Sequence, residues 1–67
     1  MNKREKFIKN LKNILKENNL TQKQLAEMIG CSKTTISKWF LMQTQPTFDN
    51  IVKLIEVLNC SFEELIS

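Results

Sequence analysis

The sequence predicts an all-α domain built from five short helices. Apolar residues recur at helical spacing through most of the chain, and each helix that they define starts at a Ser or Thr or ends at an Asn or Gly. No segment alternates between apolar and polar residues with a period of two for long enough to indicate a strand. A chain of 67 residues has room for one domain only. We therefore expect the five helices of residues 1–67 to pack into a single compact bundle.

The first predicted helix has apolar residues at the i, i+3, i+4 and i+7 positions and lysines mostly between them. Its apolar residues are Phe7, Ile8, Leu11, Ile14 and Leu15. Asn18 and Asn19 end this helix, because asparagine is the side chain after glycine that best tolerates a left-handed cap.

Two short helices follow, with only residues 30–32 between them. Thr21 and Gln24 predict a capping box at the start of the first of these helices, and Gly30, the only glycine in the chain, ends it. Such a short connection forces the two helices to cross at a steep angle. Ala26 provides a small side chain where they touch, and Gly30 can adopt the positive φ that the turn requires.

Ser32 is the predicted N-cap of the next helix, whose inward face contains Ile36, Trp39 and Phe40. The residues left on its outward face are Lys33, Thr34, Ser37 and Lys38. Short polar and basic side chains near a helix N-terminus are suited to the base edges and phosphates of a nucleic acid. This helix is therefore the predicted functional element.

The remaining helices follow a linker at residues 43–46, where Pro46 disfavours helical geometry in the residue before it. Thr47 caps a fourth helix that ends at Asn59. The predicted buried stripe of this helix is Phe48, Ile51, Val52, Ile55 and Leu58. A short fifth helix follows, with Ser61 and Glu64 as a second capping box and with Phe62, Leu65 and Ile66 as its apolar residues.

The charges are unevenly distributed along the chain. Ten Lys and Arg residues face seven acids, for a net charge of +3. The basic residues gather in positions 1–16 and the acids outnumber them in positions 49–67. One end of the molecule could therefore meet a polyanion that the other end would repel. A solvated helix face remains the alternative interpretation of the N-terminal lysines.

The sequence predicts no catalytic residue, metal site, cofactor or small-molecule ligand. Cys31 and Cys60 lie far apart among apolar residues, and the chain has no histidine and no CxxC pair, so we expect two buried side chains in a reducing compartment. No apolar run approaches the roughly 18 residues of a membrane span, and no segment resembles a signal peptide. A cytoplasmic protein that is not an enzyme is expected.

From Leu20 to Leu65 the chain resembles the Cro/phage-repressor type of helix-turn-helix domain, also called the xenobiotic-response-element family. The stretches LTQKQLAEMIGCSKTTISKW and PTFDNIVKLIEVLNCSFEEL show the resemblance. It implies a lambda-repressor-like fold in which helices two and three form the helix-turn-helix. It also implies a bacterial or phage-encoded transcriptional regulator, a repressor, that binds a palindromic operator in double-stranded DNA as a homodimer, with its third helix in the major groove.

By position, the resemblance also implies roles for individual side chains. The implied base-reading residues are Lys33, Thr34 and Lys38. The implied contacts to the DNA backbone come from Gln22, Ser32, Thr35, Ser37, Gln43 and Thr44. The implied dimer interface contains Leu41, Met42, Leu58, Cys60 and Phe62.

One segment departs from the family pattern, in which an acidic residue and then a glycine follow the third helix. This chain has Phe40, Leu41 and Met42 there, so the third helix is able to continue for another turn. We expect Phe40 to pack beneath the fourth helix and at least one of the other two side chains to be exposed, as at many protein contacts. A protein-interaction module of the antitoxin or antirepressor type is therefore the alternative function, although the outward lysines of the third helix favour DNA.

Overall fold

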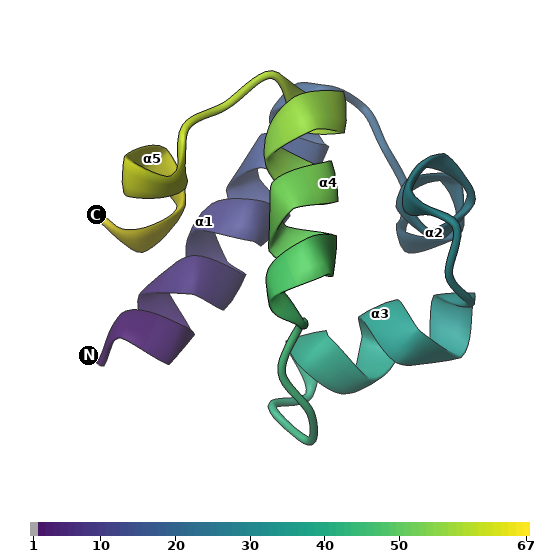
Figure 1. Cartoon of the computed structure of the whole chain (residues 1–67), viewed down its shortest axis with the longest axis horizontal. Coiled ribbons are helices and arrows are strands. Elements are labelled where there is room, and N and C mark those ends of the chain that lie inside the picture. Colours follow the sequence, from purple (N-terminus) through teal and green to yellow (C-terminus); the bar gives the residue numbers. More distant parts are fainter. Residues whose placement is uncertain (1) are drawn as a thin grey trace.

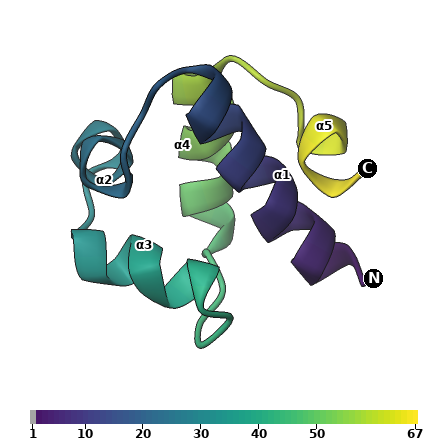
Figure 2. The same cartoon turned by 180° about the vertical axis from the view of Figure 1, so that it is seen from behind.

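The computed structural model describes residues 2–67, and over this range the chain forms five α-helices in the predicted order (Figure 1). Their bounds are α1 (Lys3–Glu17), α2 (Gln22–Ile29), α3 (Lys33–Phe40), α4 (Phe48–Leu58) and α5 (Phe62–Ile66). The helix α4 stands between the α1–α5 pair and the α2–α3 pair, as the view from behind also shows (Figure 2). The all-α five-helix prediction is confirmed.

Each helix contributes one fully buried apolar side chain to a common core. These residues are Leu11, Leu25, Ile36, Leu54 and Leu65, each with 0% of its surface exposed. Burying a side chain of this size stabilises the fold by about 1.5–3 kcal/mol relative to leaving it in water. Trp39 is 2% exposed and joins the same cluster, which places the indole in the core as the inward face of α3 predicted.

The predicted N-caps are present at every helix for which the sequence indicated one. Thr21 and Gln24 form the complete capping box, in which the Gln24 N–H donates to Thr21 Oγ1 (3.1 Å) and the Thr21 N–H donates to Gln24 Oε1 (2.8 Å). The side chains of Ser32, Thr47 and Ser61 each accept one N–H bond from the first turn of their helix. Each such cap is worth about 1 kcal/mol.

The core-facing side of α4 differs from the prediction. Phe48 is 78% exposed and Val52 is 37% exposed, whereas Leu54, which the predicted stripe left out, is fully buried. The stripe that faces the core is Ile51, Leu54, Ile55 and Leu58, which also follows the i, i+3, i+4, i+7 spacing. Because α4 is apolar over a wide arc, periodicity alone did not determine which apolar residues face inward.

Two smaller findings concern the cysteines and the length of the helices. Cys31 and Cys60 are free thiols that pack against the core and are only half-buried, so the expectation of two buried side chains holds in part. Partial burial raises the pKa of both thiols above the ordinary value, and Glu64 adds to this effect at Cys60 while Lys53 opposes it at Cys31. None of the helices in the described part of the chain has the length and apolar character needed to cross a bilayer.

Candidate nucleic-acid interface

The α2–turn–α3 unit has the steep crossing that its short connection predicts. In Figure 1, α2 is seen nearly end-on while α3 lies across the view. Gly30 takes the left-handed conformation (φ 79°), and the N–H groups of Gly30 and Cys31 both donate to Ala26 O at 2.9 Å. Ala26 is 1% exposed, so a larger side chain at this position would have to displace its neighbours, as the sequence predicted for the crossing.

The three residues predicted to read bases are all exposed on α3. Thr34 and Lys38 lie one helical turn apart on one face, and Lys33 lies beside them at the first position of the helix. The opposite side of α3 is fixed in the core by Ile36 and Trp39. The burial of Ile36 and Trp39 fixes the rotation of α3 about its own axis, and this rotation determines which side chains of α3 face outward.

The start of α3 is an ordered polar cluster. The Thr35 N–H donates to Ser32 Oγ (3.1 Å), and Ser32 Oγ and Thr35 Oγ1 form a further hydrogen bond at 3.0 Å. Ser32 is exposed and Thr35 is half-buried. Since the free N–H groups at a helix N-terminus bear partial positive charge, this end of α3 is suited to an anion such as phosphate.

Ser37 has a role that the sequence did not indicate. Its Oγ donates to Gln22 Oε1 at 2.8 Å, and both side chains are half-buried between α2 and α3. With the oxygen of the Gln22 carboxamide engaged in this bond, its Nε2 group is available as a donor to an outside acceptor. A polar residue at the start of α2 facing a serine one turn into α3 is the signal that could have revealed the pair.

The segment after α3 corrects the expectation that this helix continues. The helix ends at Phe40, and Met42, two residues further on, adopts a left-handed backbone (φ 63°). The Met42 N–H donates to Trp39 O (3.0 Å) and the Gln43 N–H to Lys38 O (2.9 Å), which is the Schellman pattern of a helix C-terminus. A non-glycine residue in this conformation costs about 1–3 kcal/mol and persists only where surrounding contacts fix it.

Gln43 and Thr44, the other residues predicted to contact the DNA backbone, are both exposed in this segment.

Phe40 is half-buried, and its ring lies beside α1 with Lys12 Nζ 5.6 Å from the ring centroid, a cation–π distance. The prediction that Phe40 packs beneath the fourth helix did not include this contact with α1, for which the sequence gives no local signal.

The predicted dimer residues divide into three groups by exposure. Leu41 is 66% exposed and Phe62 is 49% exposed, which confirms that the core cannot enclose every apolar side chain of this region. Met42 and Cys60 are half-buried, and Leu58 is in the core with 9% of its surface exposed. Leu58 therefore offers little surface to a partner, whereas the exposed Phe48 of α4, which sequence periodicity had assigned to the core, offers much more.

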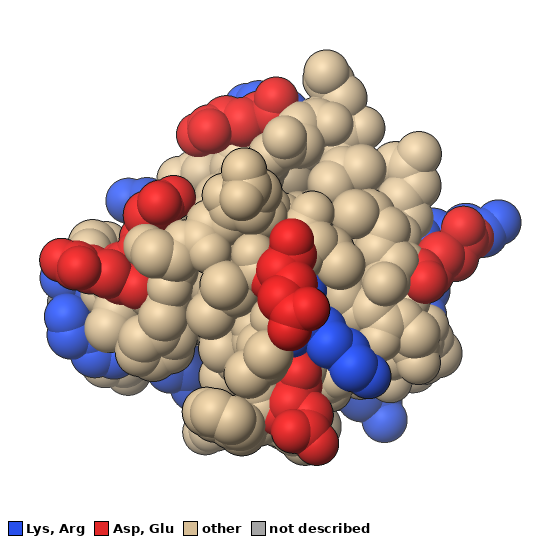
Figure 3. Space-filling model, turned by 45° about the horizontal axis from the view of Figure 1, so that its top comes forward, with Lys and Arg blue, Asp and Glu red and all other residues tan. Residues whose placement is uncertain are grey.

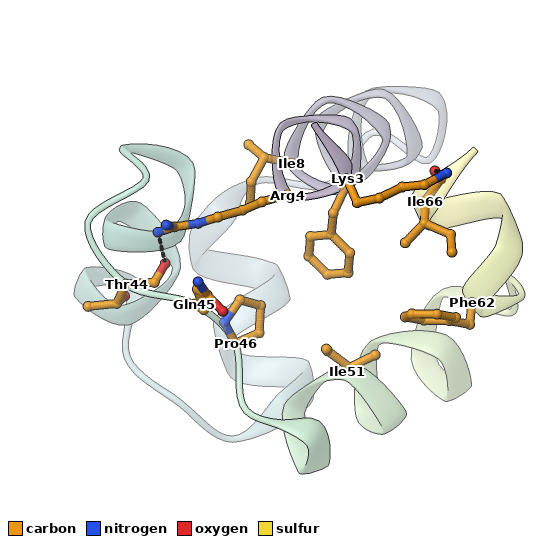
Figure 4. Close-up of a pocket in the computed structure, with 10 residues that line it drawn as sticks. Lys3, Arg4, Ile8, Thr44, Gln45, Pro46, Ile51, Phe62 and Ile66 are labelled. Carbon is orange, nitrogen blue, oxygen red and sulfur yellow. Dashed lines mark hydrogen bonds between the residues drawn. The ribbon is translucent and has the colours of Figure 1, made fainter. Parts of the chain in front are cut away.

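An apolar pocket lies between α1, the α3–α4 segment, α4 and α5 (Figure 4). Phe7, Pro46, Ile51 and Phe62 are among its apolar lining residues, and Lys3 and Arg4 lie at the same pocket. The Lys3 Nζ donates to Ile66 O at 3.3 Å, and Arg4 donates to the segment after α3. The pocket thus brings the exposed Phe62 and the linker together, although they are far apart in the sequence.

Charge differs between the ends of the molecule. In the view of Figure 3, acidic side chains are spread over the face toward the viewer, and most of the Lys and Arg groups lie at its margins. This face includes the upper end of Figure 1, whereas α3 lies at the lower end. A polyanion would be repelled by the acidic face and not by α3, whose only charged residues, Lys33 and Lys38, are basic.

Comparison with known proteins agrees with this geometry. Residues 11–65 match the helix-turn-helix family, and the chain belongs to that family. It is similar to the transcriptional repressor RstR of the cryptic phage CTXphi from Vibrio cholerae serotype O1, with 38% identity over 60 residues. The match covers 90% of this chain and 54% of the relative, so the chain spans about half the length of that repressor. No significant match to a solved structure was found.

Proposed function

We propose that this chain is a transcriptional repressor that binds a specific double-stranded DNA sequence through α3. The observation that carries the proposal is the exposed group of Lys33, Thr34 and Lys38 on a helix whose other side is anchored in the core. A lysine can donate to the O6 and N7 acceptors of guanine in the major groove, which is wide enough for an α-helix. The family membership and the similarity to a phage repressor support the same function.

The proposed contacts to the DNA backbone surround these base-reading residues. Gln22 donates through its Nε2 group, which the bond from Ser37 leaves available. Ser32 and Thr35 meet phosphate or sugar at the N-terminus of α3, and Gln43 and Thr44 add contacts beyond its C-terminus. Ser37 acts through Gln22 in this proposal rather than as a separate contact.

The proposed active form is a homodimer on a palindromic operator. One recognition helix can specify only a few base pairs, whereas two copies with α3 helices about 34 Å apart read two half-sites on one face of the duplex. The exposed side chains of Leu41 and Phe62, with Met42 and Cys60 beside the core, are the proposed contacts, and the burial of Leu58 removes it from this set. An interface this small predicts a largely monomeric free protein that dimerises on DNA.

Selection of bound sequences from a pool of random duplexes tests the proposal. It should enrich an inverted repeat whose half-sites are centred about one helical turn apart. Affinity for the enriched site should fall steeply with salt, since each neutralised phosphate contributes about −0.9 to the slope of log K against log salt. Failure to enrich any sequence, together with a slope near zero, would refute DNA binding.

A protein-interaction module is the second candidate, and the exposure of Leu41, Phe48 and Phe62 favours it. Such a module has no need for the outward lysines of α3. It predicts that Lys33→Ala and Lys38→Ala leave partner binding unchanged while Phe48→Ser weakens it. The DNA-binding proposal predicts the opposite order of effects.

A further inference from the structure

Arg4, in the first turn of α1, connects the N-terminal part of the chain to the segment that follows α3. Its Nη2 group donates to Met42 O at 2.7 Å and to Thr44 O at 3.3 Å. These are long-range contacts, and Figure 4 shows the side chain reaching from α1 toward Thr44. The two carbonyls lie on either side of Gln43, so one guanidinium fixes the backbone around that residue.

The N–H groups of the same segment are held from the other side by α3. Gln43 and Thr44 both donate to Lys38 O, at 2.9 and 3.4 Å, and Met42 donates to Trp39 O at 3.0 Å. The carbonyls of residues 42 and 44 are thus bound to α1 while the N–H groups of residues 42–44 are bound to α3. With its backbone engaged in this way, the segment presents the side chains of Gln43 and Thr44 to solvent.

The left-handed backbone of Met42 makes this arrangement dependent on Arg4. Methionine disfavours a φ of 63°, whereas glycine at this position would adopt it without strain. A strained conformation persists only where several contacts determine it together. Removing the carbonyl contacts leaves the N–H bonds from residues 42–44 to α3 and the packing of the Met42 side chain against the core to hold it.

We propose that Arg4 is a positioning residue for DNA binding: by holding the carbonyls of Met42 and Thr44, it fixes the segment that presents Gln43 and Thr44 to the DNA backbone. The inference rests on the proposed function and extends it to α1. An arginine can hold both carbonyls because its Nη2 group carries two N–H bonds, one for each acceptor.

The first experiment needs no DNA. Amide hydrogen exchange of Met42, Gln43 and Thr44 is measured by NMR in the full chain, in Arg4→Met and in Lys9→Met. The methionine keeps the aliphatic stem of Arg4 in the pocket and removes its donors, and Lys9→Met removes one positive charge from the same helix. We expect exchange to become about tenfold faster at these amides in Arg4→Met only, with core amides such as that of Ile36 unchanged. Unchanged exchange in Arg4→Met would overturn the inference.

The second experiment is a double-mutant cycle on the selected DNA site, with Arg4→Met, the pair Gln43→Ala and Thr44→Ala, and the triple variant. If Arg4 acts through the segment, its removal weakens binding by about three- to tenfold in the parent and has little further effect once Gln43 and Thr44 are alanine. Additive losses would show a direct phosphate contact or a charge effect of Arg4 and would refute the positioning role.

The two experiments separate failure of the inference from failure of the proposed function. If the parent protein enriches no duplex, DNA binding is refuted and the exchange measurement still decides whether Arg4 holds the segment. If the parent binds DNA and Arg4→Met matches it in both affinity and exchange, the proposed function stands and the role of Arg4 is refuted.

Discussion

A residue with left-handed backbone lies close to each end of α3, and the two residues are stabilised in different ways. At the α2–α3 turn the residue is Gly30 (φ 79°), and an added Cβ there would meet no atom within 4 Å. In the segment between α3 and α4 it is Met42 (φ 63°), whose carbonyl oxygen accepts a hydrogen bond from the Arg4 guanidinium. The first turn is determined by local sequence, and the second depends on a helix that is distant in the sequence. A local rule therefore predicted the first turn correctly and failed at the second.

The largest expected effect on stability is at the crossing that Gly30 makes possible. Ala26→Leu forces bulk between α2 and α3, where Ala26 is 1% exposed, and overpacking of this kind costs about 1–3 kcal/mol. That is a large share of the stability of a small domain. Thermal unfolding followed by circular dichroism measures it, and a melting temperature equal to that of the parent would contradict the proposed packing.

A smaller loss of stability is expected when Gly30, in the turn between α2 and α3, is replaced by a residue with a side chain. Gly30→Ala places an L-residue at φ 79° without a steric clash, so only the backbone strain of about 1–2 kcal/mol is expected. Urea unfolding measures the change. A loss well above this range would show that the turn needs more than positive φ. The matched substitution Asn59→Ala, at the left-handed end of α4 (φ 51°), should cost less, because asparagine is already partly strained there.

Removing the hydroxyl of Ser37 should affect DNA binding more than folding. Ser37→Ala breaks the bond to Gln22 Oε1, so the carboxamide loses its fixed orientation. We expect a loss of about three- to tenfold in affinity, equal for all duplex sequences, and less than about 1 kcal/mol in stability. Competition binding with several duplexes measures both the size and the uniformity of the loss. A changed sequence preference would show that Ser37 itself contacts a base.

The smallest effects on stability are expected at two exposed apolar side chains, Leu41 after α3 and Phe62 at the start of α5. Leu41→Gln alters a side chain that is 66% exposed, so stability should change by about 0.5 kcal/mol or less. Phe62→Gln should cost about 1 kcal/mol, because about half of this side chain is buried at the apolar pocket. Cooperative occupation of two half-sites should nevertheless be lost if these residues form the dimer contact. Quantitative footprinting measures cooperativity, with Met28→Gln, at an exposed position of α2, as the control. Unchanged cooperativity in both variants would refute the proposed interface.

The sequence predicted the elements and their caps because these depend on neighbours within one helical turn. The Thr21 capping box and the left-handed Asn19 and Gly30 are of this kind. It did not predict the exposure of Phe48 or the burial of Leu54, because α4 has more apolar residues than one face can bury and only tertiary packing selects among them.

The candidate site divides in the same way between local and long-range features. Spacing from Ser32 predicted the exposure of Lys33, Thr34 and Lys38, since the inward face of a short helix is fixed by Ile36 and Trp39. Ser37, also predicted on the outward face, is half-buried between α2 and α3. The bond from Ser37 to Gln22 and the contact of Arg4 with the segment after α3 join residues on different helices. No pattern within a single helix indicates either pair; the positions of Gln22 and Ser37 on adjoining helices offered a signal for the first, and the sequence offered none for the second.

The most direct test of DNA binding through α3 compares the sequences selected by the parent, Lys33→Ala, Lys38→Ala and Gln22→Ala from one pool of random duplexes. We predict that each lysine variant loses preference at one base pair of the half-site, at a cost of about 1–3 kcal/mol there. Gln22→Ala should bind all sequences more weakly and select the same consensus. An unchanged consensus in both lysine variants would contradict the assignment of α3 as the helix that reads DNA.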